Sequence, residues 1–198
     1  MIISTEQLVM KYSEYKSPHH KIQSMVKRGE LVPLKRGLYE TDRHTAGYML
    51  ANVLYGPSYL SFEYALSYYG MIPERVTVYT SATCSKRRKK EFQNQFGVYT
   101  YQDVPTAVYP HGYTRIETDP YPYLIADREK ALCDELSILS PIRGRKAFEE
   151  YLFEGMRLDE DIFDELDSER LKTLAGLYHR TNLEQLIRLI DRGGGYNE

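Results

Sequence analysis

The amino-acid sequence predicts an α+β fold with a small helix-and-hairpin module at the N-terminus and a larger mixed α/β domain that ends in a helical segment. Three observations lead to this prediction. Two capped helical stretches and a hairpin fill the first 45 residues, β-rich runs extend from about 76 to 125, and helical apolar spacing continues from about 127. We therefore expect two domains, residues 1–45 and 46–198.

The composition is that of a globular protein with a formal net charge of −2, so any affinity for nucleic acid must come from local clusters of cations. The two cysteines, Cys84 and Cys133, lie far apart without a CxxC pattern, which is typical of a reducing cytoplasm. The sequence shows neither a charged-then-apolar leader nor an apolar run of membrane length. We expect a cytoplasmic protein without a membrane partner.

Two helices are predicted near the N-terminus. Residues 4–7 read Ser-Thr-Glu-Gln, a capping box ahead of an apolar stretch that we expect to be helical to residue 12. The second helix is predicted between Ser17 and Gly29. Ser17 can cap it, Pro18 suits the first helical position, and Gly29 suits the position just after the end.

The second helix has two different faces. Ile22, Met25 and Val26 follow the i, i+3, i+4 spacing of one apolar stripe. The opposite side carries cationic and hydrogen-bonding groups without an acid, namely His20, Lys21, Gln23, Ser24, Lys27 and Arg28. One face is therefore expected to pack, and the other to contact a polar or anionic partner.

A small hairpin with a basic tip follows this helix, because two short apolar runs in residues 30–39 flank a Pro, Lys, Arg and Gly turn. Two helices and then a hairpin form the order of a winged helix-turn-helix module, whose second helix enters the major groove while the wing touches phosphates. The alternative is an ordinary amphipathic helix with a solvated charged side. The predicted DNA contacts are Ser17, His20, Lys21, Gln23, Ser24, Lys27, Arg28, Lys35 and Arg36.

A winged-helix core usually contains three helices, and only two precede this hairpin. The segment 43–55 is rich in apolar residues and is a candidate for the third helix. In that case it would join the DNA-binding module to the rest of the chain.

The middle of the chain is predicted to be mainly β-structure. After a break at Gly56 and Pro57, residues 58–70 have the pattern of a helix that ends at a glycine. Residues 76–80 are β-branched and aromatic, which predicts a strand. Further strands are expected in three later segments, 96–101, 113–118 and 121–125.

The most basic run of the chain lies between these predicted strands and consists of Lys86, Arg87, Arg88, Lys89 and Lys90. Five consecutive cations repel one another, and an anionic partner would relieve this repulsion. The run is therefore a possible second phosphate-contacting patch. The alternative is a solvated loop whose charge only keeps the protein in solution.

Helices are predicted for the remainder, over 127–136, 143–153, 159–166, 168–178 and 181–190. Cys133 is interpreted as a small packed residue of the first of them. Acids greatly outnumber bases between Glu149 and Glu169, so we expect this arm to lie away from DNA. Three consecutive glycines, residues 193–195, are expected to end the ordered chain.

Enzyme signatures are absent from the sequence: it contains no P-loop, no GxSxG and no HExxH. The adjacent His19 and His20 would lie about 100° apart on a helix, which is poor geometry for binding one metal ion. Asp119, Asp127, Glu129 and Lys130 are the nearest approach to a metal-dependent nuclease pattern, but a capped helix start with ion pairs is favoured. We expect no catalytic residues, no metal and no cofactor.

Three motifs resemble the AbiEi-type antitoxins, the transcriptional regulators of abortive-infection (type IV toxin–antitoxin) loci. The first joins Lys27–Val32 to Arg36–Tyr39, the second covers Gly56–Pro73, and the third covers Ile125–Asp134. The resemblance extends to about Pro141, and the helical tail matches only in order and composition.

The resemblance implies a phage-defence antitoxin that represses its own operon by binding inverted repeats in the promoter. It also implies a cognate nucleotidyltransferase-like toxin, counteracted without need of a stable complex. The alternative that we retain is a protein- or ligand-binding regulatory module in which DNA binding is secondary.

Overall fold

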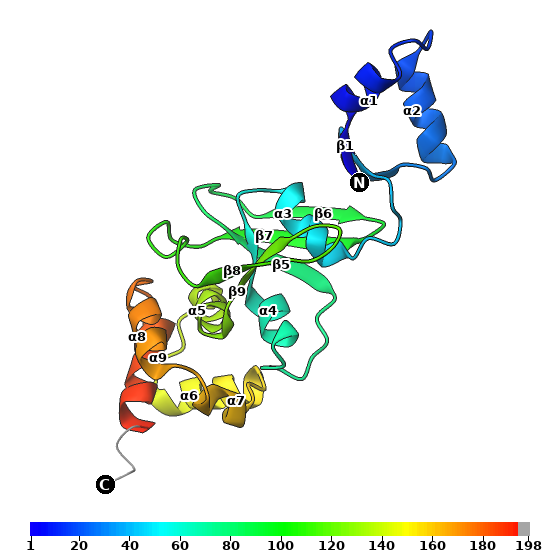
Figure 1. Cartoon of the computed structure of the whole chain (residues 1–198). Coiled ribbons are helices and arrows are strands. Elements are labelled where there is room, and N and C mark those ends of the chain that lie inside the picture. The colour runs from blue at the N-terminus through cyan, green and yellow to red at the C-terminus, as the bar shows by residue number, and fades with distance from the viewer. Residues whose placement is uncertain (194–198) are drawn as a thin grey trace.

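Two β-sheets of unequal size organise the chain, as the computed structural model shows for residues 1–193 (Figure 1). The predicted α+β class is confirmed. A three-stranded sheet with two helices lies at the N-terminal end, and a six-stranded sheet with the remaining helices makes up the rest.

The N-terminal module, residues 1–40, contains five elements in which the outer strand β1 pairs with β3 and β3 pairs with β2, all antiparallel. A separate small core of Ile3, Leu8, Ile22 and Leu31 joins the sheet to the helices. The elements are β1 (Ile2–Ser4), α1 (Thr5–Lys11), α2 (Pro18–Lys27), β2 (Val32–Lys35) and β3 (Leu38–Glu40).

The caps of the two helices differ from each other. Ser4 and Gln7 form the predicted capping box, in which the Ser4 Oγ accepts the Gln7 N–H at 3.3 Å and the Gln7 Oε1 accepts the Ser4 N–H at 2.8 Å. The predicted side-chain cap at Ser17 is wrong, because Ser17 makes no cap hydrogen bond. The start of α2 is set instead by Pro18, whose fixed φ suits the first helical position.

The large sheet has the strand order β6-β7-β5-β4-β9-β8. The pairs β5–β7 and β4–β9 are parallel and the other three pairs are antiparallel. The helices α4 (Phe62–Tyr68) and α5 (Arg128–Ile138) lie on one side of the sheet in Figure 1. The strands are β4 (Tyr59–Leu60), β5 (Val78–Thr83), β6 (Lys90–Asn94), β7 (Gly97–Asp103), β8 (Tyr113–Ile116) and β9 (Tyr123–Ala126).

Several short strands were not predicted. Residues 58–70 form β4 followed by α4, where the sequence predicted one helix. The strands β1 and β6 were also missed, since β1 has three residues and β6 is a mostly polar edge strand whose Phe92 is its apolar contact with the core. Such strands gain their stability from pairing and packing rather than from local propensity.

The segment 43–55 belongs to the large domain. It forms a 3₁₀ turn (Gly47–Leu50) and the short helix α3 (Ala51–Leu54), and its apolar residues lie in the same core as the six-stranded sheet. Within the described residues, the small core of the N-terminal module includes none of this segment. The same core also contains Leu34 of β2, so the segment 43–55 joins the N-terminal module to the large domain.

The C-terminal part is helical, as predicted. Its elements are α6 (Arg145–Glu150), a π-helical turn (Tyr151–Gly155), α7 (Glu160–Asp164), α8 (Ser168–Gly176) and α9 (Thr181–Gly193). The predicted end of order at residues 193–195 lies largely outside the described residues. In Figure 1 this helical arm and the N-terminal module lie at opposite ends of the molecule. Every helix described within residues 1–193 is too short or too polar to cross a bilayer.

A buried ion-pair cluster holds α5, β4 and the turn that follows α8 together. Lys130 and Asp134 are fully buried and one helical turn apart, and the Lys130 Nζ donates to the Asp134 Oδ1 at 2.5 Å. The Asp134 carboxylate also accepts the hydroxyls of Tyr178 at 2.6 Å, Ser61 at 2.6 Å and Tyr59 at 3.0 Å. The ammonium lies 5.3 Å from the Tyr59 ring centroid and 5.0 Å from that of Tyr178. Both charges are thus matched in the core.

We expect removal of one partner from this cluster to be strongly destabilising. Asp134→Ala leaves the Lys130 ammonium buried without its anion, so the free energy of unfolding should fall by about 3–5 kcal/mol in urea unfolding. Glu149→Ala is the matched control, because Arg145 and Glu149 are also four residues apart at 2.5 Å but on the surface. Its cost should stay below about 1 kcal/mol. Equal losses in the two variants would contradict the role of burial.

Candidate nucleic-acid interface

The exposed side of α2 is the most accessible part of the predicted interface. His20, Gln23 and Lys27 are all exposed, and Ile22 on the opposite side is buried in the small core. Figure 1 shows α1 and α2 projecting from the large domain. A ten-residue helix is about 15 Å long. This size and the outward orientation match an element that can lie in a DNA major groove.

The other predicted contacts on α2 are already engaged with neighbours. Lys21 is half-buried, and its Nζ lies 5.1 Å from the Tyr15 ring centroid and 5.8 Å from that of Tyr12. Arg28 donates from Nε to the Glu30 Oε1 at 2.5 Å and from a terminal nitrogen to the Ser24 Oγ at 2.5 Å. The hydrogen bond between Arg28 and Glu30 raises the pKa of Arg28 and lowers the pKa of Glu30.

The acid-free description of this face is thus incomplete, because Glu30 reaches the end of α2 from the next turn and neutralises Arg28. Lys27 is left as the exposed cation near that end, beside the hydrogen-bonding side chain of Gln23. Both Arg28 and Glu30 keep about half of their side-chain surface exposed, at 48% and 47%. An incoming phosphate could therefore compete for the guanidinium without unfolding the helix.

The two basic residues of the hairpin point to different surroundings. Arg36 is exposed at the turn, and this turn lies against the start of α1 because the Thr5 N–H donates to the Gly37 carbonyl at 2.9 Å. The Lys35 Nζ donates to the Leu54 carbonyl of the large domain at 2.6 Å. Lys35 is one of the predicted DNA contacts, and in this arrangement its ammonium joins the hairpin to α3.

Further contacts hold the module on the large domain. Leu34 of β2 is part of the large core, and its carbonyl accepts the Asn94 side-chain amide at 3.1 Å. Glu40, at the end of β3, is fully buried and its Oε2 accepts the Tyr121 hydroxyl at 2.7 Å. Burial raises the pKa of Tyr121, and the bond to Glu40 adds to the rise. The exposed side of α2 is therefore presented in one orientation by polar contacts as well as by packing.

The basic run, Lys86 to Lys90, forms the loop before β6 and the first residue of that strand. Lys86 donates to the Gly56 carbonyl at 3.0 Å and lies over the Tyr55 ring, and Lys90 lies over the Phe92 ring. Arg87, Arg88 and Lys89 are exposed. The hairpin contact at Asn94 is four residues along β6, about 13 Å from Lys90. The five cations thus split into two packed lysines and three exposed groups.

The acids and the lysine of the nuclease alternative do not converge on one point. Asp127 caps α5 and pairs with Arg170, and Glu129 accepts the Asp167 N–H at 3.1 Å. Lys130 is enclosed in the buried ion-pair cluster, and Asp119 is exposed. Within residues 1–193, no three His, Cys, Asp or Glu side chains come together as a metal site. The contacts of these residues fit the favoured interpretation, in which they form a capped helix start with ion pairs.

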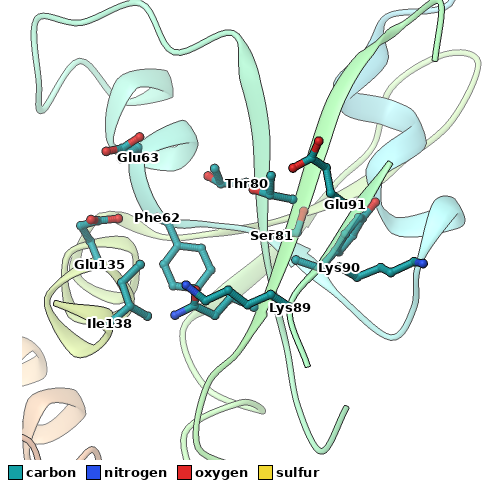
Figure 2. Close-up of a pocket in the computed structure, with 12 residues that line it drawn as sticks. Phe62, Glu63, Thr80, Ser81, Lys89, Lys90, Glu91, Glu135 and Ile138 are labelled. Atoms are coloured by element: carbon teal, nitrogen blue, oxygen red, sulfur yellow. The ribbon is translucent and has the colours of Figure 1, made fainter. Parts of the chain in front are cut away.

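A pocket that the sequence did not indicate lies between the helices α4 and α5 and the strands β5, β6 and β7 (Figure 2). Its volume is about 440 Å³. Glu63 and Glu135 stand on the helical side, and Thr80, Ser81 and Lys89 are on the strand side. The only local signal was an acid, Glu135, at a position where the helical spacing places an apolar side.

Comparison with known proteins identifies the fold and leaves the family open. No family model and no curated protein sequence matches the chain. A solved structure that resembles it is the crystal structure of the RV2827C protein from Mycobacterium tuberculosis, with a TM-score of 0.60 and 14% sequence identity. The alignment covers 98% of this chain and 72% of that chain. At this identity the likeness shows a shared fold, which includes the N-terminal module as well as the large domain.

The neighbouring residues Lys35 and Arg36 should respond differently to substitution. Lys35→Met removes the hydrogen bond to the Leu54 carbonyl, so we expect the free energy of unfolding to fall by about 1 kcal/mol in urea unfolding. Arg36→Met, the matched control, changes an exposed residue and should stay within about 0.5 kcal/mol of the unsubstituted protein. A larger loss from Arg36→Met than from Lys35→Met would contradict the assigned orientations.

Proposed function

We propose that the chain is an antitoxin and a DNA-binding autorepressor of a type IV toxin–antitoxin operon, with a winged helix-turn-helix as its N-terminal module. The observation that carries the DNA-binding part is the exposed polar side of α2, fixed on a three-stranded sheet whose hairpin ends in Arg36. The module also has the predicted order of two helices followed by a hairpin, and in a helix-turn-helix the second helix is the one that lies in the major groove.

The antitoxin part of the proposal is supported by the resemblance to the AbiEi-type regulators. Two of its motifs, residues 56–73 and 125–134, supply partners of one buried cluster: Tyr59 and Ser61 from the first, and Lys130 and Asp134 from the second. Residue types shared with the family are thus residues that this fold needs. The proposed partner is a nucleotidyltransferase-like toxin, counteracted without need of a stable complex.

On DNA, α2 would lie in the major groove with Gln23 and Ser24 toward base edges. Gln can pair with adenine through its amide, and Arg28 can contact a phosphate or a guanine when it leaves Glu30. Lys27 and Arg36 would contact phosphates, and Lys21 would add positive potential from its position over Tyr12 and Tyr15. Two copies on an inverted repeat would place two such helices on successive turns of one face of the duplex.

The acidic C-terminal arm fits this arrangement, because Figure 1 places it at the end of the molecule opposite to α2. The proposed interface is restricted to the N-terminal module. The exposed cations Arg87, Arg88 and Lys89 come just before β6, whereas the contact with the hairpin is made by Asn94 at the other end of that strand. These three residues therefore serve as a comparison in the binding test.

Lys27→Ala should weaken binding to the promoter of the chain's own operon and reduce its dependence on salt. Loss of one phosphate contact lowers the slope of log affinity against log salt concentration by about 0.9. The measurement is a gel shift of the full chain at several salt concentrations. Gln23→Ala should instead reduce discrimination between the operator and a scrambled duplex, with an unchanged salt slope.

Arg88→Ala is the control for Lys27→Ala, because it also removes one exposed cation but outside the module. We expect its salt slope to match that of the unsubstituted protein. A salt slope lowered by Arg88→Ala and unaffected by Lys27→Ala would move the interface to the loop before β6. Unchanged binding by the double variant Lys27→Ala, Arg28→Ala would exclude α2 as the recognition helix.

A second candidate function, a protein-binding regulatory module, is favoured by a groove in the helical arm. The groove has a volume of about 540 Å³, an apolar lining that includes Phe153, Phe163 and Leu189, and acids that include Glu160 and Asp191. Apolar clefts with polar rims are typical of interaction sites.

Separation of the two functions is possible in cells that express the adjacent toxin from an independent promoter. If DNA binding is secondary, the full-length double variant Lys27→Ala, Arg28→Ala should protect these cells as well as the unsubstituted chain. Loss of both protection and promoter binding, at an equal level of folded protein, would tie neutralisation to the DNA-binding face.

A further inference from the structure

The pocket between α4, α5 and the strands has an unusual combination of walls. Phe62 and Ile138 supply apolar surface, and two carboxylates, Glu63 and Glu135, stand on the helical side (Figure 2). On the strand side, Lys89 reaches toward Phe62 and Ile138, whereas Lys90 points away. The volume of about 440 Å³ lies within the range of sites for small organic molecules.

Two polar groups of this pocket have unused hydrogen-bonding capacity. Glu135 is only 6% exposed, and its Oε2 has no hydrogen-bond partner among the described residues. The Ser81 Oγ on the strand side is fully buried and likewise has no partner in the described chain. Buried polar atoms are normally paired, so two unpaired atoms in the walls of one pocket point to a missing partner.

The charges indicate which kind of partner is missing. Burial, with a further contribution from the Glu63 carboxylate, raises the pKa of Glu135 to about 7. The other charged or titratable groups near it are Asp134 on the same helix, Tyr151 from the π-helical turn and Lys89 across the pocket. Asp134 is already neutralised by Lys130, and Lys89 forms no ion pair with Glu63 or Glu135 within 4.0 Å. Two neighbouring carboxylates therefore lack a cation.

We propose that this pocket binds a small organic cation, a primary ammonium carried on a short apolar chain. Its ammonium would lie between Glu63, Glu135 and the Ser81 hydroxyl, and its chain would contact Phe62 and Ile138. A primary ammonium has three donors, which match two carboxylates and a hydroxyl. The site is separate from α2, so it stands whether or not the chain binds DNA.

Other ligand classes fit the pocket less well. An anion would meet two carboxylates and gain only the Lys89 ammonium. A metal ion needs more hard ligands than the described residues gather here, since they hold no cluster of three acids, histidines or cysteines. A diamine would place its second ammonium toward Lys89, which would repel it. A monovalent ammonium with an apolar tail avoids each of these conflicts.

Isothermal titration of the full chain with pentylammonium at pH 8 tests the proposal, with pentanoate as the probe of opposite charge. We expect saturable binding of pentylammonium and none of pentanoate. Glu135→Gln keeps the shape of the side chain and removes its charge, so the affinity for pentylammonium should fall about tenfold or more. Lys89→Ala removes a repelling cation and should raise the affinity. Glu117→Gln changes an acid outside the pocket that pairs with Arg115, and it should change nothing.

The pH dependence gives a second readout on the unsubstituted chain, which does not depend on the stability of a variant. A bound cation favours ionised Glu135, so binding should release a proton near pH 7 and the affinity should rise between pH 6 and 8. Glu63→Gln, an exposed substitution, should also weaken binding.

Binding of pentanoate in place of pentylammonium would overturn the proposal. So would pentylammonium binding that persists unchanged in both Glu135→Gln and Glu63→Gln, or the absence of any binding to the folded chain. None of these three results would bear on the gel-shift test of α2, so failure of this proposal and failure of the proposed function can be told apart.

Discussion

The Lys130–Asp134 ion pair is the constraint on which the large domain depends. Both groups have no solvent exposure, and burial of two charges is stabilising only when their hydrogen-bonding capacity is met. The requirement fixes three segments at once, because the partners come from β4, the turn after α8 and the residue before α4. Tyrosine suits this role, since its ring packs against the ammonium while its hydroxyl reaches the carboxylate. The same logic recurs in Tyr99 and Tyr101, whose buried hydroxyls donate to carbonyls of Gly47 and Ala51.

The N-terminal module depends on the large domain for its orientation. Its own core contains four buried side chains, and below about 40 residues a chain seldom folds on apolar burial alone. Leu34 in the large core and the bond from Lys35 to the Leu54 carbonyl supply the missing attachment. A lysine that reads as a DNA contact in the sequence is thus used for docking, and this use leaves the opposite side of the module, with Gln23 and Lys27, facing solvent.

Local sequence rules predicted the parts of the fold that local forces determine. The capping box at Ser4, the start of α2 at Pro18, the hairpin turn at Gly37 and the C-terminal helices all follow from short-range spacing. The features that short-range spacing does not determine depend on partners that are distant in the sequence or beyond a turn. Residues 43–55 pack in the large core. The position of the Lys35 ammonium is set by a carbonyl 19 residues away. Glu30 comes near Arg28 only because the chain turns at Gly29. The exposed side of α2 was predictable; the pocket beside Glu135 was not, because it is formed by α4, α5 and three strands that span residues 62–138 of the sequence.

Asp134 and Glu135 are adjacent acids on one helix, and the contrast between them separates structural from functional burial. The Asp134 carboxylate accepts hydrogen bonds from a lysine and three hydroxyls, so all of its partners come from within the fold. Glu135 is almost as buried, yet one of its oxygens lacks a partner, and the nearby Lys89 does not provide one. A glutamate that served packing alone could be replaced by glutamine or leucine without this electrostatic cost. Its position beside a second carboxylate and an open pocket is therefore what a site for a cation from outside the chain requires.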